Sequence, residues 1–182
     1  KKKIKMKGLV FTELLEYVEE NFGFDMADKI IEEANLENGG SFTQAGNYPF
    51  EELVKLLVAL SKESNIEIPK LLEIFGEHMF TKLISLNPQL KYNFKSCLDL
   101  ISNVDNIIHP EVQKLYPGAD LPAFNLIEKF DNKIVIDYIS SKHLEPFAIG
   151  LMRGSAKSFG EEINIKQEKN NDLTRFTIEV EK

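Results

Sequence analysis

The spacing of apolar residues changes about two thirds of the way along the chain. Before residue 110, apolar residues recur every three or four positions, which is the spacing of one buried helix face. After residue 123, short β-branched runs surround turn residues such as Asp131-Asn132, a pattern typical of antiparallel strands. A chain that places its helices first and its strands last folds as an α+β protein. We therefore expect an N-terminal helical subdomain followed by a small antiparallel sheet with one inserted helix.

The same periodicity predicts the individual elements. Helices are expected over Leu9–Asn21, Met26–Ala34, Pro49–Ser61, Ile68–Phe75, Gly76–Leu86, Phe94–Ile108, Glu111–Tyr116 and Pro146–Phe159. Two hairpins are expected, Phe124–Phe130 with Lys133–Ser140 and Ile163–Glu168 with Thr174–Glu181. The 182 residues have the length of one domain. Because Met6 resembles a natural first residue, we expect a single domain over residues 6–182 and a tail, Lys1–Lys5, without a role in the fold.

Charge and composition exclude several classes of protein. The net charge is −7, from 22 basic and 29 acidic residues, whereas a nucleic-acid-binding protein needs a basic face. The single cysteine, Cys97, forms neither an internal disulfide nor a Cys-rich metal site. No run approaches the ~20 apolar residues of a membrane-spanning helix, and no apolar segment of a secretory signal follows Lys1–Lys5. We expect a cytoplasmic protein that neither binds nucleic acid nor inserts into a membrane.

One of the three histidines stands out by its position. No Ser/His/Asp set, Gly-rich phosphate loop or paired metal-ligand spacing is present, so we do not expect an enzyme. His109 ends an apolar helix and precedes Pro110, which pushes the residue before it out of helical geometry and opens the next helix. Such a histidine either packs in the interior with a carbonyl as its partner, or serves as the axial ligand of a haem, whose porphyrin supplies four other ligands.

The residues around His109 resemble a known family. The segment His109–Pro117 (HPEVQKLYP), followed by Leu121–Phe124 (LPAF), is similar to the proximal-histidine segment of haem–nitric oxide/oxygen binding (H-NOX) domains. Met6-Lys7-Gly8 resembles the family's opening, and Tyr138–Lys142 (YISSK) resembles its Tyr-x-Ser-x-Arg motif. The resemblance covers nearly all of residues 6–181. It implies the H-NOX fold, with a haem b between the helical part and the sheet and with His109 as the ligand of its iron.

The resemblance also implies how the haem is held. Tyr138 and Ser140 would donate hydrogen bonds to the propionates, and a cation at position 142 would pair with their charge. Residues 138, 140 and 142 would share one strand face. Lys142 replaces the family's arginine and loses its bidentate fork. That replacement indicates either weaker haem binding or only the lysine-rich composition of this chain, which has two arginines, Arg153 and Arg175.

The positions that match the distal pocket are all apolar. They are Val10, Leu14, Met79, Leu83, Phe147 and Leu151, a set that without a haem would simply be core. Phe147 stands where oxygen-binding members carry a tyrosine that donates a hydrogen bond to bound dioxygen. Nitric oxide needs no such donor. The resemblance therefore implies a sensor of nitric oxide and carbon monoxide that discriminates against oxygen.

Signalling is likewise implied by the resemblance. Nitric oxide would weaken the bond between His109 and the iron, and Pro122, which matches the proline that presses on the porphyrin, would hold the resting haem distorted. The output would act in trans on a histidine kinase or a cyclic-di-GMP enzyme. Two alternatives remain open: a haem-free binding module on the same fold, and a bis-histidine redox sensor in which His78 is the sixth ligand. A peroxidase-like enzyme is disfavoured, because the distal side offers no acid/base residue.

Overall fold

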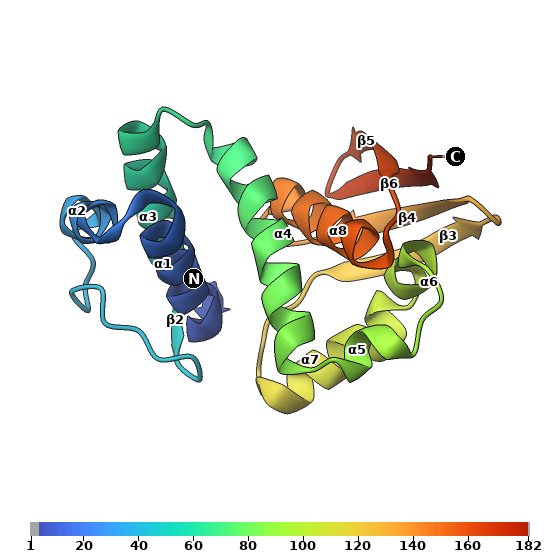
Figure 1. The fold of residues 1–182 in the computed structure, drawn as a ribbon, viewed down its shortest axis with the longest axis horizontal. Helices are drawn as coiled ribbons and strands as arrows, with labels where there is room; N and C mark the ends of the chain where they lie inside the picture. The colour runs from blue at the N-terminus through green and yellow to red at the C-terminus, as the bar shows by residue number, and fades with distance from the viewer. Residues whose placement is uncertain (1–3, 182) are drawn as a thin grey trace. The chain divides into compact units, whose positions relative to one another are not determined.

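The computed structural model describes residues 4–181, and the chain divides into two compact units between Phe75 and Gly76 (Figure 1). The boundary falls within one helix, α4 (Ile68–Leu86). The sequence left open whether Gly76–Leu86 continues or restarts the helix over Ile68–Phe75, and in the structure it continues it. The helices come first and a four-stranded sheet with one inserted helix comes last, so the predicted α+β architecture is confirmed. The single domain over residues 6–182 stays a prediction.

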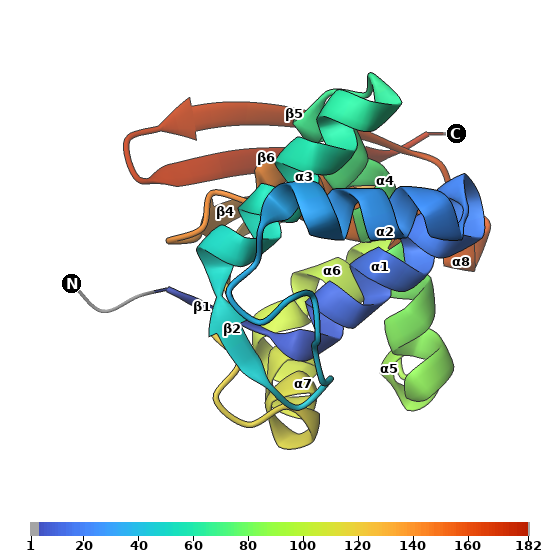
Figure 2. The same ribbon diagram turned by 90° about the vertical axis from the view of Figure 1, so that its left-hand side faces the viewer.

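The first unit is built from three helices and a short strand pair. It comprises β1 (Lys5–Lys7), α1 (Gly8–Phe22), α2 (Phe24–Ala34), β2 (Asn47–Pro49), α3 (Phe50–Ser64) and the start of α4. Strands β1 and β2 lie side by side in Figure 2. Lys5 pairs with Pro49, and the Ile4 carbonyl accepts a hydrogen bond from the Phe50 N–H at 2.9 Å. Ile4 and Lys5 thus belong to the fold, contrary to expectation, while Lys1–Lys3 lie outside the described residues.

Gly8 determines how α1 begins. Its N–H donates to the Gly46 carbonyl at 2.9 Å, and a Cβ built on it would overlap the Thr43 carbonyl oxygen and lie 2.9 Å from the Tyr48 ring. Only glycine allows the 43–48 loop to approach so closely. The Tyr48 ring packs against Phe11 of α1, with ring centroids 5.5 Å apart. This contact fixes the first turn of α1 against the loop and β2.

The second unit combines short helices with an antiparallel sheet. It comprises the rest of α4, α5 (Gln89–Tyr92), α6 (Cys97–Ser102), the π-helical turn η1 (Val104–Ile108), α7 (His109–Leu115), β3 (Ala123–Lys129), β4 (Lys133–Ile139), α8 (Glu145–Phe159), β5 (Ile163–Asn170) and β6 (Leu173–Val180). The strand order is β3-β4-β6-β5, with every neighbouring pair antiparallel. Both predicted hairpins are therefore confirmed. In β3, Ile127 is an extra residue, because the register shifts between Leu126 and Glu128.

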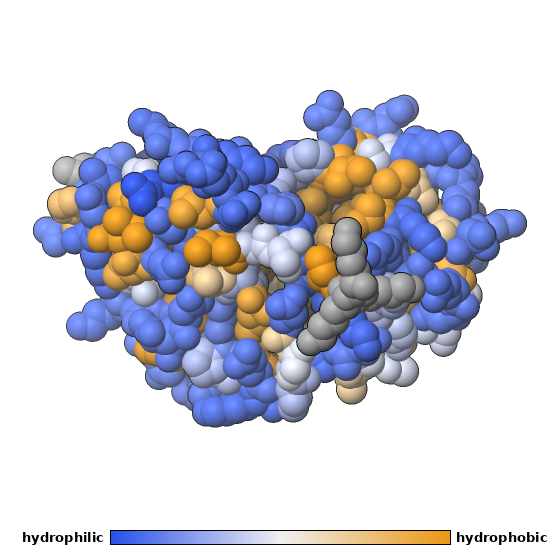
Figure 3. Space-filling view, turned by 180° about the vertical axis from the view of Figure 1, so that it is seen from behind, coloured by the Kyte–Doolittle hydropathy of each residue, from blue (hydrophilic) through white to orange (hydrophobic). Residues whose placement is uncertain are grey.

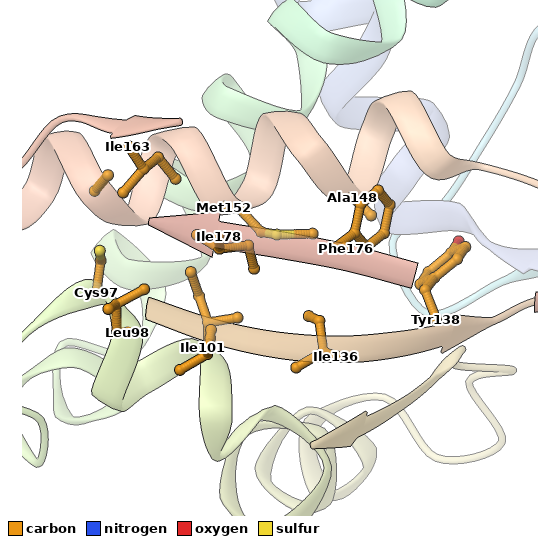
Figure 4. Close-up of a cluster of buried hydrophobic side chains, with 12 residues drawn as sticks. Cys97, Leu98, Ile101, Ile136, Tyr138, Ala148, Met152, Ile163, Phe176 and Ile178 are labelled. Carbon is orange, nitrogen blue, oxygen red and sulfur yellow. The ribbon is translucent and has the colours of Figure 1, made fainter. Parts of the chain in front are cut away.

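The core of this unit lies between one face of the sheet and the helices α6 and α8 (Figure 4). Strand residues two apart, such as Ile134, Ile136 and Tyr138 of β4, point into it, as the pleat requires. Cys97 and Met152 reach it from the two helices, and Cys97 is fully buried. Tyr138 lies at one end of the row of labelled side chains, next to Phe176 of β6.

The helix predicted over Phe94–Ile108 is wrong in its extent. Helix α6 ends at Ser102, Asn103 leaves helical geometry with φ −112° and ψ 14°, and η1 follows. The Asn103 side chain donates a hydrogen bond back to the Asp99 carbonyl at 2.8 Å. Such local side-chain bonding competes with the helix and ends it. Apolar periodicity alone cannot reveal a break of this kind.

The surface is mostly hydrophilic, with small groups of apolar residues between charged ones on the face seen in Figure 3. Over residues 4–181, no helix is both long and apolar enough to cross a membrane.

Candidate functional site

His109 opens helix α7 directly after the π turn η1. Its φ of −61° and ψ of −41° are helical, and its N–H donates to the Val104 carbonyl, five residues back. The prediction that Pro110 pushes His109 out of helical geometry is therefore wrong. Pro110 lies in the first turn of α7, where its missing N–H costs no hydrogen bond. The π turn before it shifts the preceding carbonyls out of register with the proline ring, so the helical path continues through the joint.

A carboxylate one turn before the histidine fixes the imidazole ring. Asp105 Oδ1 lies 2.9 Å from His109 Nδ1, and Asp105 Oδ2 accepts a hydrogen bond from the Phe124 N–H at 2.8 Å. The carboxylate favours the tautomer with its proton on Nδ1, so that the lone pair of Nε2 remains for a metal. Asp105 thus holds His109 and strand β3 together. Asp105 was not among the predicted site residues, although its i, i+4 spacing to His109 could have indicated it.

The environment of His109 disfavours the protonated imidazole. Only 18% of its side chain is exposed, and this burial lowers the pKa of His109, while the Asp105 charge partly opposes the shift. A neutral imidazole is the form that ligates a metal. Among the described residues, no group of three or more His, Cys, Asp and Glu side chains could hold a bare metal ion. The donor set therefore fits a haem, which needs one protein ligand, better than it fits a free cation.

Aromatic rings connect His109 with the predicted propionate site. His109 lies against Phe124 at 5.8 Å between ring centroids, and Phe124 lies against Tyr138 at 5.2 Å. Burial, with a smaller contribution from the Glu145 charge, raises the pKa of Tyr138 to about 12. The hydroxyl therefore stays protonated and can donate. Ser140 is a hydrogen-bonding neighbour of that hydroxyl, so the structure brings these two predicted residues together.

The expectation that Tyr138, Ser140 and Lys142 share one strand face is wrong. Strand β4 ends at Ile139, because the chain turns there and His143 adopts a left-handed φ of 51°. The Ser140 hydroxyl oxygen accepts from the Lys142 N–H at 3.2 Å. The Lys142 ammonium binds Asp120, at 2.5 Å from Oδ2 and 3.0 Å from the carbonyl oxygen. Asp120 was not predicted as the partner of Lys142.

The loop that precedes β3 carries Pro122. This proline is half-buried and lies two residues after Asp120. The Lys142–Asp120 pair therefore joins the segment after β4 to the segment that contains Pro122.

Several of the predicted distal residues lie where α4 and α8 meet. A Cβ on Gly76 of α4 would overlap the Phe147 carbonyl oxygen and lie 2.9 Å from the Leu151 nitrogen, so the two backbones are in direct contact. Leu151 packs with Ile108 on a cluster formed by Phe80, Phe94 and Leu100. Met79 is buried and Leu83 is half-buried, one turn apart on α4.

The other sequence-selected residues lie elsewhere. Val10 and Leu14 are on α1, in the first unit, where Leu14 is buried and Val10 is half-buried. His78, the predicted sixth ligand of the alternative site, is half-buried on α4 next to Met79. His143 is exposed and lies 3.9 Å from Glu145.

Comparison with known proteins gives a consistent result. Residues 7–167 match the family model described as Haem-NO-binding. The chain is similar to the crystal structure of the Fe(II) unliganded H-NOX protein from K. algicida, with 36% identity, a TM-score of 0.91 and 97% of each chain covered. It is similar to the H-NOX protein from S. oneidensis in the Fe(II)NO state, with 26% identity, a TM-score of 0.89, and 97% and 100% covered. The H-NOX from Shewanella woodyi, solved in the Fe(II)CO state, matches with 36% identity, a TM-score of 0.82, and 96% and 94% covered.

The match to the family model spans most of the chain, and the solved H-NOX structures share its whole fold. This chain therefore belongs to the haem-NO-binding family, the family of the H-NOX proteins.

Proposed function

We propose that this chain senses nitric oxide and carbon monoxide through a haem b held by His109, and that it discriminates against oxygen. H-NOX domains are haem-based gas sensors and are generally not catalytic. The observation that carries the proposal is the buried His109 imidazole with Asp105 Oδ1 2.9 Å from its Nδ1, an arrangement that would leave Nε2 to ligate the iron. The haem would supply a ferrous iron that binds diatomic gases.

The residues of this chain would divide the remaining tasks. His109 would ligate the iron, and Asp105 would orient the imidazole and raise its basicity as a ligand. The protonated Tyr138 hydroxyl and its neighbour Ser140 would donate hydrogen bonds to the propionates. Pro122 would pack on the porphyrin. Apolar side chains of the second unit would exclude water from the gas site; they are Met79, Leu83, Phe147 and Leu151.

Discrimination against oxygen would come from the side chain at position 147. Bound dioxygen is polarised and gains from a hydrogen-bond donor, whereas phenylalanine offers none. The missing hydrogen bond is worth about 1–3 kcal/mol, which lowers oxygen affinity by about 5- to 150-fold. Nitric oxide and carbon monoxide lose little, since neither depends on such a donor. The relatives from S. oneidensis and Shewanella woodyi were solved with nitric oxide and carbon monoxide, respectively.

Signal output would begin at the joint between η1 and α7. Any movement of the His109 ring moves the Asp105 carboxylate, which also holds the Phe124 N–H of β3. A displacement of the ligand would thus reach the edge of the sheet through the 2.9 Å contact of His109 with Asp105 and the hydrogen bond from Phe124 to Asp105. A partner that contacts the two arrangements differently would read this change. We propose a histidine kinase or a cyclic-di-GMP enzyme acting in trans as that partner.

The test is the visible spectrum of the purified, reduced protein with and without each gas. We expect a haem spectrum that changes with nitric oxide and carbon monoxide but not with air. His109→Gly should lose the native spectrum and regain it when imidazole is supplied, whereas His143→Gly, at an exposed site, should behave as the wild type. Phe147→Tyr should raise oxygen affinity.

Three results would contradict the proposal. A protein that takes up no added haem would favour a haem-free binding module. Native ligation in His109→Gly without imidazole would show that another residue holds the iron. A six-coordinate ferrous spectrum before any gas is added would point to His78 as a second ligand.

A further inference from the structure

The side chain of Lys142, the last residue of the Tyr-x-Ser-x-Arg-like segment, forms an ion pair with a distant part of the chain. Its side chain is 6% exposed, and its ammonium binds both Oδ2 and the carbonyl oxygen of Asp120, 22 residues earlier in sequence. A buried ammonium needs such partners, because its desolvation is otherwise uncompensated. Among residues 4–181, Asp120 supplies the only carboxylate within ion-pair distance of this ammonium. The charge of the Lys142 ammonium is therefore compensated within the protein, by Asp120.

The partner residue belongs to the loop between α7 and β3. Asp120 lies between Gly118, which has a left-handed φ of 75°, and Pro122. The Ala119 N–H donates to the Tyr116 carbonyl at 3.1 Å, which closes a turn. Proline has no N–H, so Pro122 cannot fix itself by donating a backbone hydrogen bond. The contacts of Lys142 with both the side chain and the backbone of Asp120 therefore hold the loop in position.

The backbone of Lys142 is fixed as well. Its N–H donates to the Ser140 hydroxyl oxygen, and Ser140 in turn neighbours the Tyr138 hydroxyl. Lys142 is thus attached at its backbone to the end of β4 and at its ammonium to the loop before β3.

We propose that Lys142 is a positioning residue that fastens the 118–122 loop, and with it Pro122, to the end of β4, and that it is not the charge partner of the haem propionates. The fastening role rests on the observed pair, and its consequence for haem retention rests on the proposed function. In this chain the propionates are then held by the hydroxyls of Tyr138 and Ser140. The replacement of the family's arginine by lysine fits this role. One ammonium can bind a single carboxylate oxygen and a carbonyl oxygen without the bidentate geometry of a guanidinium.

The experiment is a charge-exchange cycle on the haem-loaded protein. The variants are Lys142→Glu, Asp120→Lys and the double variant, with Lys62→Met as a control because it breaks an exposed pair with Glu33 in the first unit. The measurements are the rate of haem transfer to excess apomyoglobin and the midpoint of thermal unfolding by circular dichroism. If Lys142 fastens the loop, each single variant loses haem on the order of tenfold faster and the double variant recovers most of the loss. Lys62→Met should match the wild type.

The alternative role gives a different pattern. If Lys142 pairs with the propionates, Lys142→Glu places a negative charge beside them, and the double variant stays as poor as that single variant. Asp120→Lys alone would then retain haem at least as well as the wild type. Either result overturns the proposal. Substituting the dimethyl ester of haem separates the two roles again, because fastening predicts the same fold-change for Lys142→Met with haem and with its ester.

The two proposals can fail separately. If the protein takes up no haem, the proposed function fails, and the unfolding midpoints of the same four proteins still test the fastening pair. If the shift in unfolding midpoint of the double variant equals the sum of the shifts of the two single variants, Lys142 and Asp120 do not interact. That result would refute the pair even in a protein that binds haem normally.

Discussion

Replacing Asp105 by asparagine tests the arrangement that orients His109. The asparagine keeps the size of the aspartate but has one acceptor oxygen, whereas Asp105 accepts from Phe124 N–H at 2.8 Å and lies 2.9 Å from His109 Nδ1. In the haem-loaded protein, where Nε2 would hold the iron and Nδ1 would keep its proton, one of the two contacts therefore places a donor against a donor. A hydrogen bond to a charged group contributes about 1.5–3 kcal/mol. Because the Asp105 side chain is 32% exposed, we expect the low end, about 1.5 kcal/mol, in the free energy of unfolding.

Two measurements check this expectation. Urea unfolding should show a lower midpoint with an unchanged slope. In the ferrous haem protein, the iron–histidine stretching frequency in resonance Raman spectra should fall, because the imidazole loses its anionic acceptor and becomes a weaker donor to the metal. Glu111→Gln is the matched control, since it removes a carboxylate from α7 that pairs with Lys114 and not with His109. Unchanged stability together with an unchanged stretching frequency in Asp105→Asn would refute the reasoning.

Three further predictions concern the fold. Gly8→Ala should destabilise the protein by about 3 kcal/mol in thermal or urea unfolding, because its Cβ overlaps the Thr43 carbonyl; Gly118→Ala, with open space around its Cβ but a φ of 75°, should cost less. Burial raises the pKa values of Cys97 and Tyr138, from 9.0 and 10.0, to about 12 in each case. The folded state favours their protonated forms, so the free energy of unfolding should fall as the pH rises from about 9 to 12. Tyr138→Phe should reduce this decrease in the free energy of unfolding, whereas Tyr92→Phe, at an exposed site, should leave it unchanged. Arg175 holds the pKa of Asp137 below its usual value through bonds of 2.7 and 2.9 Å. The stabilisation from this pair should be complete above about pH 4 and lost as the pH falls through the lowered pKa. Asp137→Asn should reduce that acid dependence, in contrast to Asp131→Asn in the exposed turn.

The regular elements could be predicted because each one buries a single face. The alternation through Ile134, Ile136 and Tyr138 gives the inward face of β4, and the spacing of Leu53, Leu56, Leu57 and Leu60 gives that of α3. The short strands β1 and β2 could not be predicted. Each has three residues, and each depends on a partner more than 40 positions away, as Lys5 does on Pro49. Local periodicity contains no information on a pair so short and so distant.

The candidate site was predictable in its residue types but not in its pairings. His109 was found from its position before Pro110 and from the family resemblance, yet the helical geometry at His109 depends on a π turn that no apolar pattern marks. The partner of Lys142 was missed because Asp120 lies in a loop, where side-chain direction follows from turns and not from a period. Tyr138 could be placed on a strand, whereas the end of that strand at Ile139 is set by the turn through His143.

The extra residue in β3 limits how far a movement can travel. Phe124 lies on one side of Ile127, and the pairs Glu128–Val135 and Lys129–Ile134 lie on the other. A bulge interrupts the ladder and lets the bulged strand bend without breaking its remaining hydrogen bonds. If Phe124 is displaced, we expect β3 to bend at Ile127, so that the turn around Asp131-Asn132 keeps its position. The surface that moves with His109 should therefore lie over the first half of β3. A spectroscopic probe attached at the Asp131-Asn132 turn should show no change when a gas binds.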